Sequence, residues 1–382
     1  MQIKISVLKE TKSGEKRVAL VPGVVDKLVR LGATISMQSG AGNAVKLTDE
    51  AFRNVTFVAD PKILVSDADV VLAVQPPPLD LVRAIKQGAI LICFVYAHRE
   101  AALVKLMRER KITCFAMELV PRISRAQSMD ALSSQAALAG YYAALLGATH
   151  LARILPRMTT AAGSLRPATV LVMGLGVAGL QAIATAHRLG AVVGAYDVRP
   201  ETKQEAASVG AKFVETGVDA RGEGGYAREL TAEEKDIVDK ALTKHIRQAD
   251  LIITAAAVPG RPAPTLIRKE QVDGMKPGAV IVDLAADGGG NCEYTSPGET
   301  TRVNQVTIVA PTNVPSLLGE HASELYAKNL LNLLELLIRD GRLDPDWQDE
   351  VIAKTALTHA GRIINPAAAD AVDADGQITQ KT

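Results

Sequence analysis

One stretch decides the fold of this chain: TVLVMGLGVAGLQ, at residues 169–181. It continues an apolar run, 168–173, that is typical of a buried strand, and a helix-forming segment follows the spacing Gly174-x-Gly176-x-x-Gly179. In this setting the first glycine allows a tight turn, the second lets the backbone approach a pyrophosphate, and the third lets the helix pack on the strand. The helix N-terminus offers amide donors to phosphate groups. The stretch therefore predicts a dinucleotide-binding unit.

The next apolar run, 191–196, ends at Asp197, 18 residues beyond Gly179. A carboxylate near this place in the motif accepts the adenosine ribose hydroxyls and repels a 2′-phosphate. Asp197 therefore favours NAD(H) over NADP(H). Arg199 keeps the alternative open, because a guanidinium two residues on could pair with a 2′-phosphate.

Short apolar runs alternate with amphipathic stretches on both sides of this motif, which is typical of buried parallel strands in an α/β protein. Helices are expected at 22–32, 101–110 and 178–189. The remaining runs of strand length are 2–7, 68–74, 89–95, 112–117, 212–215, 251–256, 279–284 and 306–310. We expect residues 216–230, rich in glycine and charge, to form a mobile surface loop.

Two long helices are expected to bracket the nucleotide unit. One is formed by the uncharged run 131–149. The other is the leucine-rich segment Ser323–Arg339, which we expect to end at Gly341. The economical arrangement is two Rossmann-like, doubly wound parallel-sheet domains joined by these helices, with a cleft between them. The first domain would comprise residues 1–132 and 320–382, with a disordered Ala/Asp-rich tail, and the second residues 133–319.

Composition excludes several classes of protein. Forty-three basic and 42 acidic side chains give a net charge of +1, so no nucleic-acid or acidic-membrane footprint is expected. Lysines interrupt the apolar positions of the N-terminus, which lacks a signal-peptide core. The three cysteines form no disulfide framework and no CxxC metal pair, and they favour a reducing cytosol. The run 131–149 is long enough to cross a bilayer, but its Ala, Ser, Gln and Gly content indicates a helix buried against protein.

A second polar motif, PRISRAQSMDALSSQ at residues 121–135, lies where the chain is expected to pass between the two domains. One interpretation is a polar linker in which Ser128 or Asp130 caps the following helix. The other interpretation is a ligand-binding segment, because Arg, Gln, Asp and Ser are concentrated at one place.

The segment RISRAQSMD, followed by a strand–GLGVAG–helix unit, resembles the peripheral NAD(H)-binding component of proton-translocating nicotinamide nucleotide transhydrogenases. The matches GGYA at 224–227, VPGRPAP at 258–264 and GGNCEY at 289–294 extend the resemblance to nearly the whole chain. The fold is shared with alanine dehydrogenase. The resemblance implies a homodimer that binds NAD(H), membrane-spanning and NADP(H)-binding partner subunits, and a place on the cytoplasmic face of the inner membrane without direct insertion.

The resemblance also implies roles for individual residues. Gln127, Asp130 and Arg122 would serve the hydride-transfer site, with Gln127 on the nicotinamide ribose and Asp130 with Ser133 on the carboxamide. No metal is implied. The cofactor-contacting set would be Arg122, Ile123, Ser124, Arg125, Gln127, Asp130, Ser133, Gly174, Gly176, Val177, Ala178, Gly179, Asp197, Val198, Arg199, Gly225, Tyr226 and Ala257.

Proton chemistry separates the two activities. Oxidising an amino or hydroxy acid requires a general base and a cation for the substrate carboxylate. Where the alanine dehydrogenase pattern has Lys and His, this chain has Gln75 and Phe94, although Arg17 and Asp287 remain. Hydride transfer between two nicotinamides needs no such base. Direct transfer to NADP⁺ on a partner subunit, coupled to proton translocation, is therefore the favoured function.

Two alternatives stay open. One is an alanine dehydrogenase-like enzyme acting on an amino or 2-oxo acid, with His98 as a substitute base. The other is a module that senses NAD(H) without catalysis.

Overall fold

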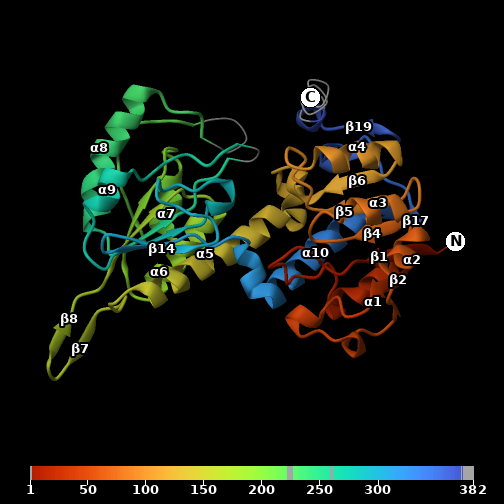
Figure 1. Ribbon diagram of the computed structural model, residues 1–382, viewed down its shortest axis with the longest axis horizontal. Coiled ribbons are helices and arrows are strands. Elements are labelled where there is room, and N and C mark those ends of the chain that lie inside the picture. The colour runs from red at the N-terminus through yellow and green to blue at the C-terminus, as the bar shows by residue number, and fades with distance from the viewer. Residues whose placement is uncertain (1, 222–226, 259–260, 371, 373–382) are drawn as a thin grey trace. The chain divides into compact units, whose positions relative to one another are not determined.

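The computed structural model describes residues 2–221, 227–258, 261–370 and 372 (Figure 1). The chain divides into two compact units: unit 1 is Met1–Gln135 with Ser316–Thr382, and unit 2 is Ala136–Pro315. Each unit contains a mainly parallel sheet, which confirms the predicted α/β class. The two units are described separately.

Unit 1 is built on an eight-stranded sheet of order β19-β18-β6-β5-β4-β1-β2-β3. The first six strands along the chain are parallel; the late strand β18 is antiparallel to β6, and β19 is antiparallel to β18. Figure 1 shows this late blue segment beside the early orange segment at β6. The strands are β1 (Ile3–Val7), β2 (Ala33–Gln38), β3 (Val55–Val58), β4 (Val70–Leu72), β5 (Ile90–Cys93), β6 (Thr113–Ala116), β18 (Ala356–His359) and β19 (Arg362–Ile363).

The sheet of unit 1 is buried on both faces. In β4, Val70 and Leu72 belong to one apolar cluster while Val71, on the opposite face, belongs to another. This alternation explains why the strand reads as a continuous apolar run. The helices of unit 1 are α1 (Pro22–Arg30), α2 (Pro61–Ser66), α3 (Leu79–Ala84), α4 (Ala101–Glu109), α10 (Gly319–Leu337) and α11 (Glu350–Thr355).

Unit 2 has a seven-stranded sheet of order β11-β10-β9-β12-β13-β15-β14, in which only the edge strand β14 is antiparallel among the described strands. Its strands are β9 (Thr169–Met173), β10 (Val192–Tyr196), β11 (Lys212–Phe213), β12 (Leu251–Thr254), β13 (Val280–Asp283), β14 (Thr300–Val303) and β15 (Val306–Val309). Its helices are α6 (Val177–Arg188), α7 (Thr202–Ser208), α8 (Ala232–Gln248) and α9 (Lys269–Asp273).

The uncharged run forms helix α5 (Ala131–His150), whose sequence begins in unit 1 and ends in unit 2. Within unit 2, a Cβ on Gly140 would lie 2.0 Å from the carbonyl oxygen of Ala178, and one on Gly147 would lie 2.6 Å from Leu251. The small residues therefore let α5 pack closely on α6 and β12. Over the described residues, no helix has the length and apolar character of a membrane span.

Several elements differ from the sequence predictions. Helix α10 was expected to continue to Arg339, but it ends at Leu337, because Ile338–Arg339 (β16) pairs with Arg342–Leu343 (β17). Asp340 and Gly341 have φ of +50° and +72°, so Gly341 forms a hairpin turn instead of a helix end. A second hairpin, β7 (Met158–Thr160) with β8 (Gly163–Leu165), was not predicted.

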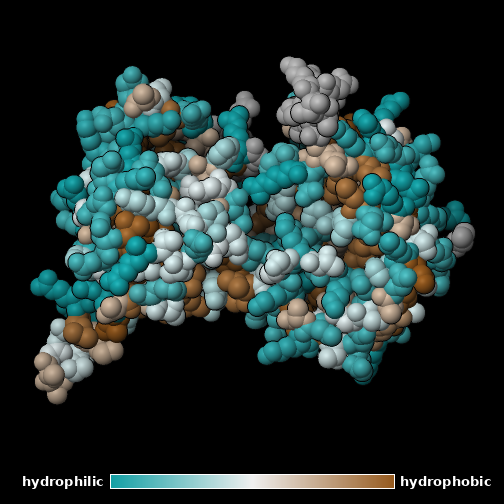
Figure 2. Space-filling view, in the orientation of Figure 1, coloured by the Kyte–Doolittle hydropathy of each residue, from teal (hydrophilic) through white to brown (hydrophobic). Residues whose placement is uncertain are grey.

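The β7–β8 hairpin carries apolar side chains on its exposed surface. Met158 and Leu165 are paired across it and are 43% and 52% exposed. Figure 2 shows apolar colour gathered on this hairpin, which Figure 1 labels. A two-stranded hairpin has little stability by itself in water.

The structure describes part of each of the two segments that were expected to lack fixed structure, the loop 216–230 and the C-terminal tail. Arg228 pairs with Glu234 and donates to the carbonyl of Asp219 at 2.8 Å, so the described ends of the 216–230 loop are held in place. In the C-terminal tail, Ala368 and Val372 pack in the second apolar cluster of unit 1. Residues 222–226 and 373–382 lie outside the described residues.

Candidate functional site

The glycine motif of unit 2 forms the turn between β9 and α6. Gly174 has φ of +91°, and a Cβ there would lie 2.6 Å from the backbone nitrogen of Ala256. A Cβ on Gly179 would lie 1.9 Å from the carbonyl oxygen of Gly174. Both positions therefore require glycine, one for the turn and the other for the packing of helix on strand.

Gly176 differs from its neighbours, because a Cβ at this position would meet nothing within 4 Å. The space above the first turn of α6 is thus open. Among the described residues no side chain caps this helix, and its first intrahelical bond is Leu180 N to Gly176 O, at 2.9 Å. The amides of Val177, Ala178 and Gly179 precede that bond. Amides with no bond to any described residue, beside open space, suit a diphosphate, so this chain's residues fit the pyrophosphate of a dinucleotide.

Asp197 follows β10 and turns back to the glycine loop. Its Oδ2 accepts the backbone N–H of Leu175 at 2.7 Å, and its Oδ1 accepts that of Arg199 at 2.9 Å. The Arg199 side chain adds two bonds, from Nε to Oδ1 and from Nη2 to Oδ2, both at 2.9 Å. The carboxylate predicted to bind ribose is therefore adjacent to the predicted phosphate loop. Val198 lies between these two residues, and its carbonyl accepts Ala220 N at 2.9 Å.

The loop after β12 carries Ala257, which is exposed. Its predecessor Ala256 is clamped by the buried Asn291, which accepts Ala256 N at 3.0 Å and donates to Ala256 O at 2.8 Å. Asn291 is in turn held by the buried Asp283, which accepts Asn291 N at 2.6 Å and Thr295 Oγ1 at 2.6 Å. No role was predicted for Asp283 from the sequence. Its only signal was an acid at the end of an apolar strand.

The motif 121–135 lies in unit 1 as a 3-10 turn, Ser124–Met129, that leads into α5. Asp130 accepts the backbone N–H of Ser133 at 2.9 Å and its hydroxyl at 2.6 Å, which is the geometry of a helix N-cap. Asn329 of α10 donates to the carbonyl of Ser128 at 2.8 Å and holds the turn in place. The capping interpretation and the ligand interpretation are compatible, because a cap fixes the carboxylate in place.

The other predicted residues of this motif differ in their surroundings. Arg125 forms a two-bond ion pair with Asp349, at 2.8 and 2.6 Å, and is thus tied to the N-terminus of α11. Arg122, Ser124 and Gln127 are exposed, and Ile123 is half-buried against the first apolar cluster. The predicted residues thus fall in two groups, 122–133 on unit 1 and 174–257 on unit 2. Gly225 and Tyr226 lie outside the described residues.

The places where a dehydrogenase would need a base hold groups that do not accept protons. Gln75, after β4, donates its amide to Glu15 at 2.8 Å. Phe94, after β5, is buried and stacks on Tyr326 at 5.3 Å between ring centroids. Arg17 is bound by Glu15 through two bonds and donates to Gln135 at 3.0 Å. Although burial alone would raise the pKa of Glu15, Arg17 lowers it to about 2.

Two half-buried glutamates that were not predicted from the sequence have their carboxyl groups at the carboxyl ends of these strands. Glu10 accepts the amides of Val74 and Gln75 at 2.6 and 3.1 Å, and Glu118 accepts those of Val95 and Tyr96. Burial raises the pKa of Glu10 to about 7 and raises that of Glu118. The only sequence feature that could have indicated either residue is an acidic side chain soon after a predicted strand.

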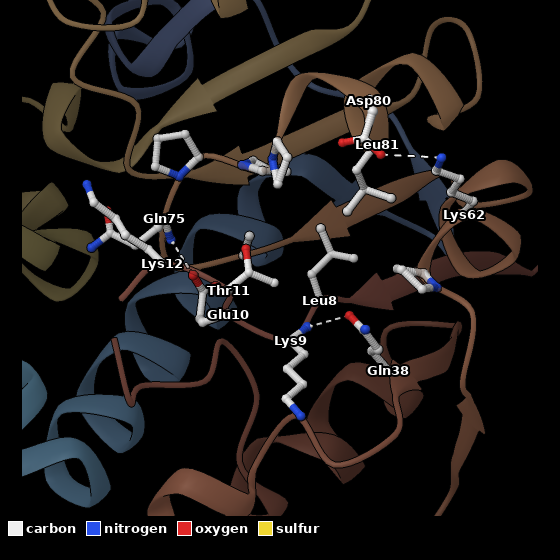
Figure 3. Close-up of a pocket in the computed structure, with 15 residues that line it drawn as sticks. Leu8, Lys9, Glu10, Thr11, Lys12, Gln38, Lys62, Gln75, Asp80 and Leu81 are labelled. Carbon is white, nitrogen blue, oxygen red and sulfur yellow. Dashed lines mark hydrogen bonds and ion pairs between the residues drawn. The ribbon is translucent and has the colours of Figure 1, made fainter. Parts of the chain in front are cut away.

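Glu10 also borders a small hollow of about 150 Å³ at the carboxyl ends of β1 and β4 (Figure 3). Both sheets share the strand order 3-2-1-4-5, and this hollow lies where that order reverses, which is where open α/β sheets bind ligands. Here the polar groups bond one another: Lys9 N to Gln38, and Lys62 to Asp80. The Glu10 carboxylate of unit 1 and the glycine loop of unit 2 thus occupy equivalent positions in their sheets. In unit 1 this position is filled by hydrogen bonds from backbone amides to Glu10, whereas in unit 2 it is open.

Comparisons with known proteins place the chain. The family model described as alanine dehydrogenase/PNT, N-terminal domain, matches residues 6–139, and the corresponding C-terminal domain matches residues 143–366. The chain belongs to the alanine dehydrogenase/PNT family. Among members of the family, an NAD(P) transhydrogenase alpha-subunit polypeptide of Rhodospirillum rubrum is 47% identical, over 96% of this chain and 98% of its own length.

Two further members bracket the functional question. The crystal structure of transhydrogenase from Sinorhizobium meliloti is 40% identical, with a TM-score of 0.84 over 95% of this chain and 99% of that one. Alanine dehydrogenase of Mycobacterium tuberculosis is 28% identical over 95% of each. Within the alanine dehydrogenase/PNT family the chain is therefore more similar to these transhydrogenases, as the motif 122–130 predicted.

Proposed function

We propose that this chain is the NAD(H)-binding component of a transhydrogenase that transfers hydride directly between NADH and NADP⁺. The observation that carries the proposal is that one chain has both an open nucleotide loop at Gly176 and residues that cannot act as a base, Gln75 and Phe94, at the positions where a dehydrogenase has its base. The 40–47% identity to transhydrogenases supports it.

Within unit 2, the first-turn amides of α6 would bind the pyrophosphate, and Asp197 would accept the adenosine ribose hydroxyls. Within unit 1, we assign Arg122, Gln127 and Asp130 to holding the nicotinamide, with Ser133 fixing Asp130. Gly225 and Tyr226 remain part of the proposed cofactor-binding set.

Bound NADH supplies the hydride, which passes from C4 of one nicotinamide to C4 of the other. The transfer moves no proton on or off a heteroatom, so the protein contributes position and the exclusion of water. Polar side chains that position the ring suit this task. A fixed cap such as Asp130, bonded twice to Ser133, loses little freedom when it accepts a hydrogen bond from the carboxamide.

We further propose that NADP(H) is bound by a partner subunit and that a membrane-spanning partner couples the transfer to proton translocation, with this chain peripheral on the cytoplasmic face of the inner membrane. We also propose a homodimer, to which the exposed Met158 and Leu165 of the β7–β8 hairpin would contribute apolar area. Copurification with the membrane subunit and light scattering of Met158→Ser/Leu165→Ser test these points separately.

The central experiment mixes the purified chain with the NADP(H)-binding partner domain and NADH. We expect NADH-dependent reduction of an NADP⁺ analogue whose spectrum differs from that of NADPH. Omitting the partner domain is the control. Tight NADH binding without any transfer would contradict the proposal.

A dehydrogenase acting on an amino or 2-oxo acid is the second candidate. It is favoured by the retained Arg17 and by Glu10, a half-buried residue whose carboxyl pKa is raised to about 7. A screen of small amino and 2-oxo acids with NAD⁺ or NADH decides between the two. Turnover of any of them that Glu10→Gln abolishes would favour the dehydrogenase.

A further inference from the structure

The carboxylate of Asp197 has no acceptor position left for a nucleotide. A carboxylate offers about four lone-pair sites. Four N–H groups fill them: the backbone N–H of Leu175 and of Arg199, and Nε and Nη2 of the Arg199 side chain, all at 2.7–2.9 Å. A ribose that binds here must therefore displace one or more of these donors.

The two backbone donors cannot leave without refolding their loops. Leu175 lies in the phosphate loop between Gly176 and Gly174, whose backbone N–H donates to the carbonyl of Tyr196 at 2.9 Å. The Leu175 carbonyl also accepts Arg199 Nη2 at 3.3 Å, a bond that the guanidinium gives up when it leaves. The backbone of Arg199 is fixed by Thr202, whose hydroxyl donates to the Arg199 carbonyl at 2.7 Å. The guanidinium, by contrast, leaves by rotation of a side chain that is 17% exposed.

A guanidinium fork and a ribose diol present the same pattern to a carboxylate. Each offers two parallel donors, one to each oxygen. We propose that Arg199 is a specificity latch: its side chain occupies the place of the ribose 2′- and 3′-hydroxyls on Asp197 and is displaced by them when NAD(H) binds. This inference rests on the proposed NAD(H) site of unit 2 and adds a competing group within it.

The latch explains how a chain with an arginine beside the ribose site discriminates against a 2′-phosphate. A 2′-phosphate lacks the 2′-hydroxyl donor that would replace Nε or Nη2, so it cannot satisfy Asp197 once the arginine has left. While Asp197 is present, its charge also holds the guanidinium and cancels it. Removing the carboxylate should therefore release Arg199 to bind a phosphate.

The test measures NADH and NADPH affinity by the fluorescence of the bound dihydronicotinamide, for the full chain and for Arg199→Met, Arg199→Lys, Asp197→Ser and Asp197→Ser/Arg199→Met. Met keeps the length of the side chain without its donors. We expect Arg199→Met to bind NADH about two- to fivefold more tightly, the change to which 0.5–1 kcal/mol of lost competition corresponds. Arg199→Lys, with one compact donor group, should fall between Met and wild type.

The Asp197 variants supply a readout that a structural role for Arg199 would not produce. Asp197→Ser should weaken NADH binding and strengthen NADPH binding, and the NADPH gain should disappear in the double variant. Asp197→Asn, which keeps the shape of the side chain, guards against misfolding of the serine variant.

The outcomes are distinct. Weaker NADH binding by Arg199→Met, or an NADPH gain that survives loss of Arg199, would overturn the latch while leaving the NAD(H) site intact. A wild-type chain that binds no NADH would overturn both the latch and the proposed function.

Discussion

Glu15 and Arg17 form a two-bond ion pair, at 2.8 and 2.6 Å, with side chains only 0% and 4% exposed. Glu15 also accepts the hydroxyl of Ser316 at 2.8 Å, which ties the N-terminal segment to the residues that precede α10. The pair thus joins the early and late segments of unit 1. Because both charges are removed from water, each is stabilised by the opposite charge of its partner.

Removing one member of this pair should destabilise unit 1 strongly. Arg17→Met leaves the Glu15 carboxylate buried without its cation, and such a loss costs about 3–5 kcal/mol. We expect a lower urea midpoint for unfolding. Lys240→Met, which breaks the exposed i,i+4 pair with Asp236, is the matched control and should change the free energy of unfolding by about 0.5 kcal/mol or less. Equal effects of the two substitutions would contradict this account.

Glu10 should make stability fall as pH rises from about 4.5 to about 7. Its folded-state pKa is raised to about 7, so between these values the folded chain holds a proton that the unfolded chain has released. The stabilisation is present below pH 4.5 and lost as the pH passes 7, a difference of roughly 3 kcal/mol at 1.36 kcal/mol for each pKa unit. Glu15, with a folded pKa of about 2, acts in a lower window, where stability is lost as the pH falls from 4.5 towards 2.

Denaturant unfolding at pH 5 and pH 8 checks the Glu10 prediction. The wild-type chain should lose more stability between these pH values than Glu10→Gln, which cannot titrate. A pH dependence that is identical in the two chains would show that Glu10 titrates at its ordinary value.

The glycines of the nucleotide loop should separate binding from folding. Gly179→Ala places a Cβ 1.9 Å from the Gly174 carbonyl, and an overpacked contact of this kind costs about 1–3 kcal/mol. Gly176→Ala meets nothing within 4 Å and should leave the melting temperature nearly unchanged. It should nevertheless weaken NADH binding about tenfold or more, because its methyl group stands where the pyrophosphate approaches. Calorimetry of melting and of binding on the same two variants measures both effects.

Gln127 should matter for transfer more than for binding. Its side chain is exposed on the turn before α5, and shortening it in Gln127→Asn keeps the amide but moves it by one methylene. We expect nearly unchanged NADH affinity and hydride transfer to the partner domain slowed about 10²-fold, the effect of a 1 Å misplacement. Stopped-flow transfer rates and equilibrium titration provide the two numbers. Parallel loss of both would contradict the proposed position.

The sequence predicted well those elements in which the local residue pattern and the position in the fold favour the same secondary structure. The run 169–173 is apolar because β9 is central in its sheet, and the glycine spacing is fixed by contacts within the same turn. Helix α8 was missed although Thr231 and Glu234 form a capping box at its start. That signal was present in the sequence as T-x-x-E.

Other features depend on partners that are distant along the chain. Arg125 pairs with Asp349, 224 positions away, and no residue near Arg125 in the sequence indicates this ion pair. Glu10 accepts hydrogen bonds from the backbone amides of residues 74 and 75, and the sequence around Glu10 does not indicate these partners. The hairpin at Asp340–Gly341 could have been predicted, because an Asp-Gly pair between Ile338 and Leu343 is a turn signal.

The strand order of unit 1 has a consequence for synthesis of the chain. Strand β18 pairs with β6, and α10 packs against α1, so the first sheet lacks neighbours until residues beyond 316 have left the ribosome. Unit 2, a continuous stretch of 180 residues from 136 to 315, has no such requirement. The unit with the glycine loop is therefore complete first, while the N-terminal 135 residues wait with exposed apolar edges. A nascent chain arrested soon after residue 315 has left the ribosome would contain all of unit 2 with its glycine loop, while the first sheet would still lack β18 and α10.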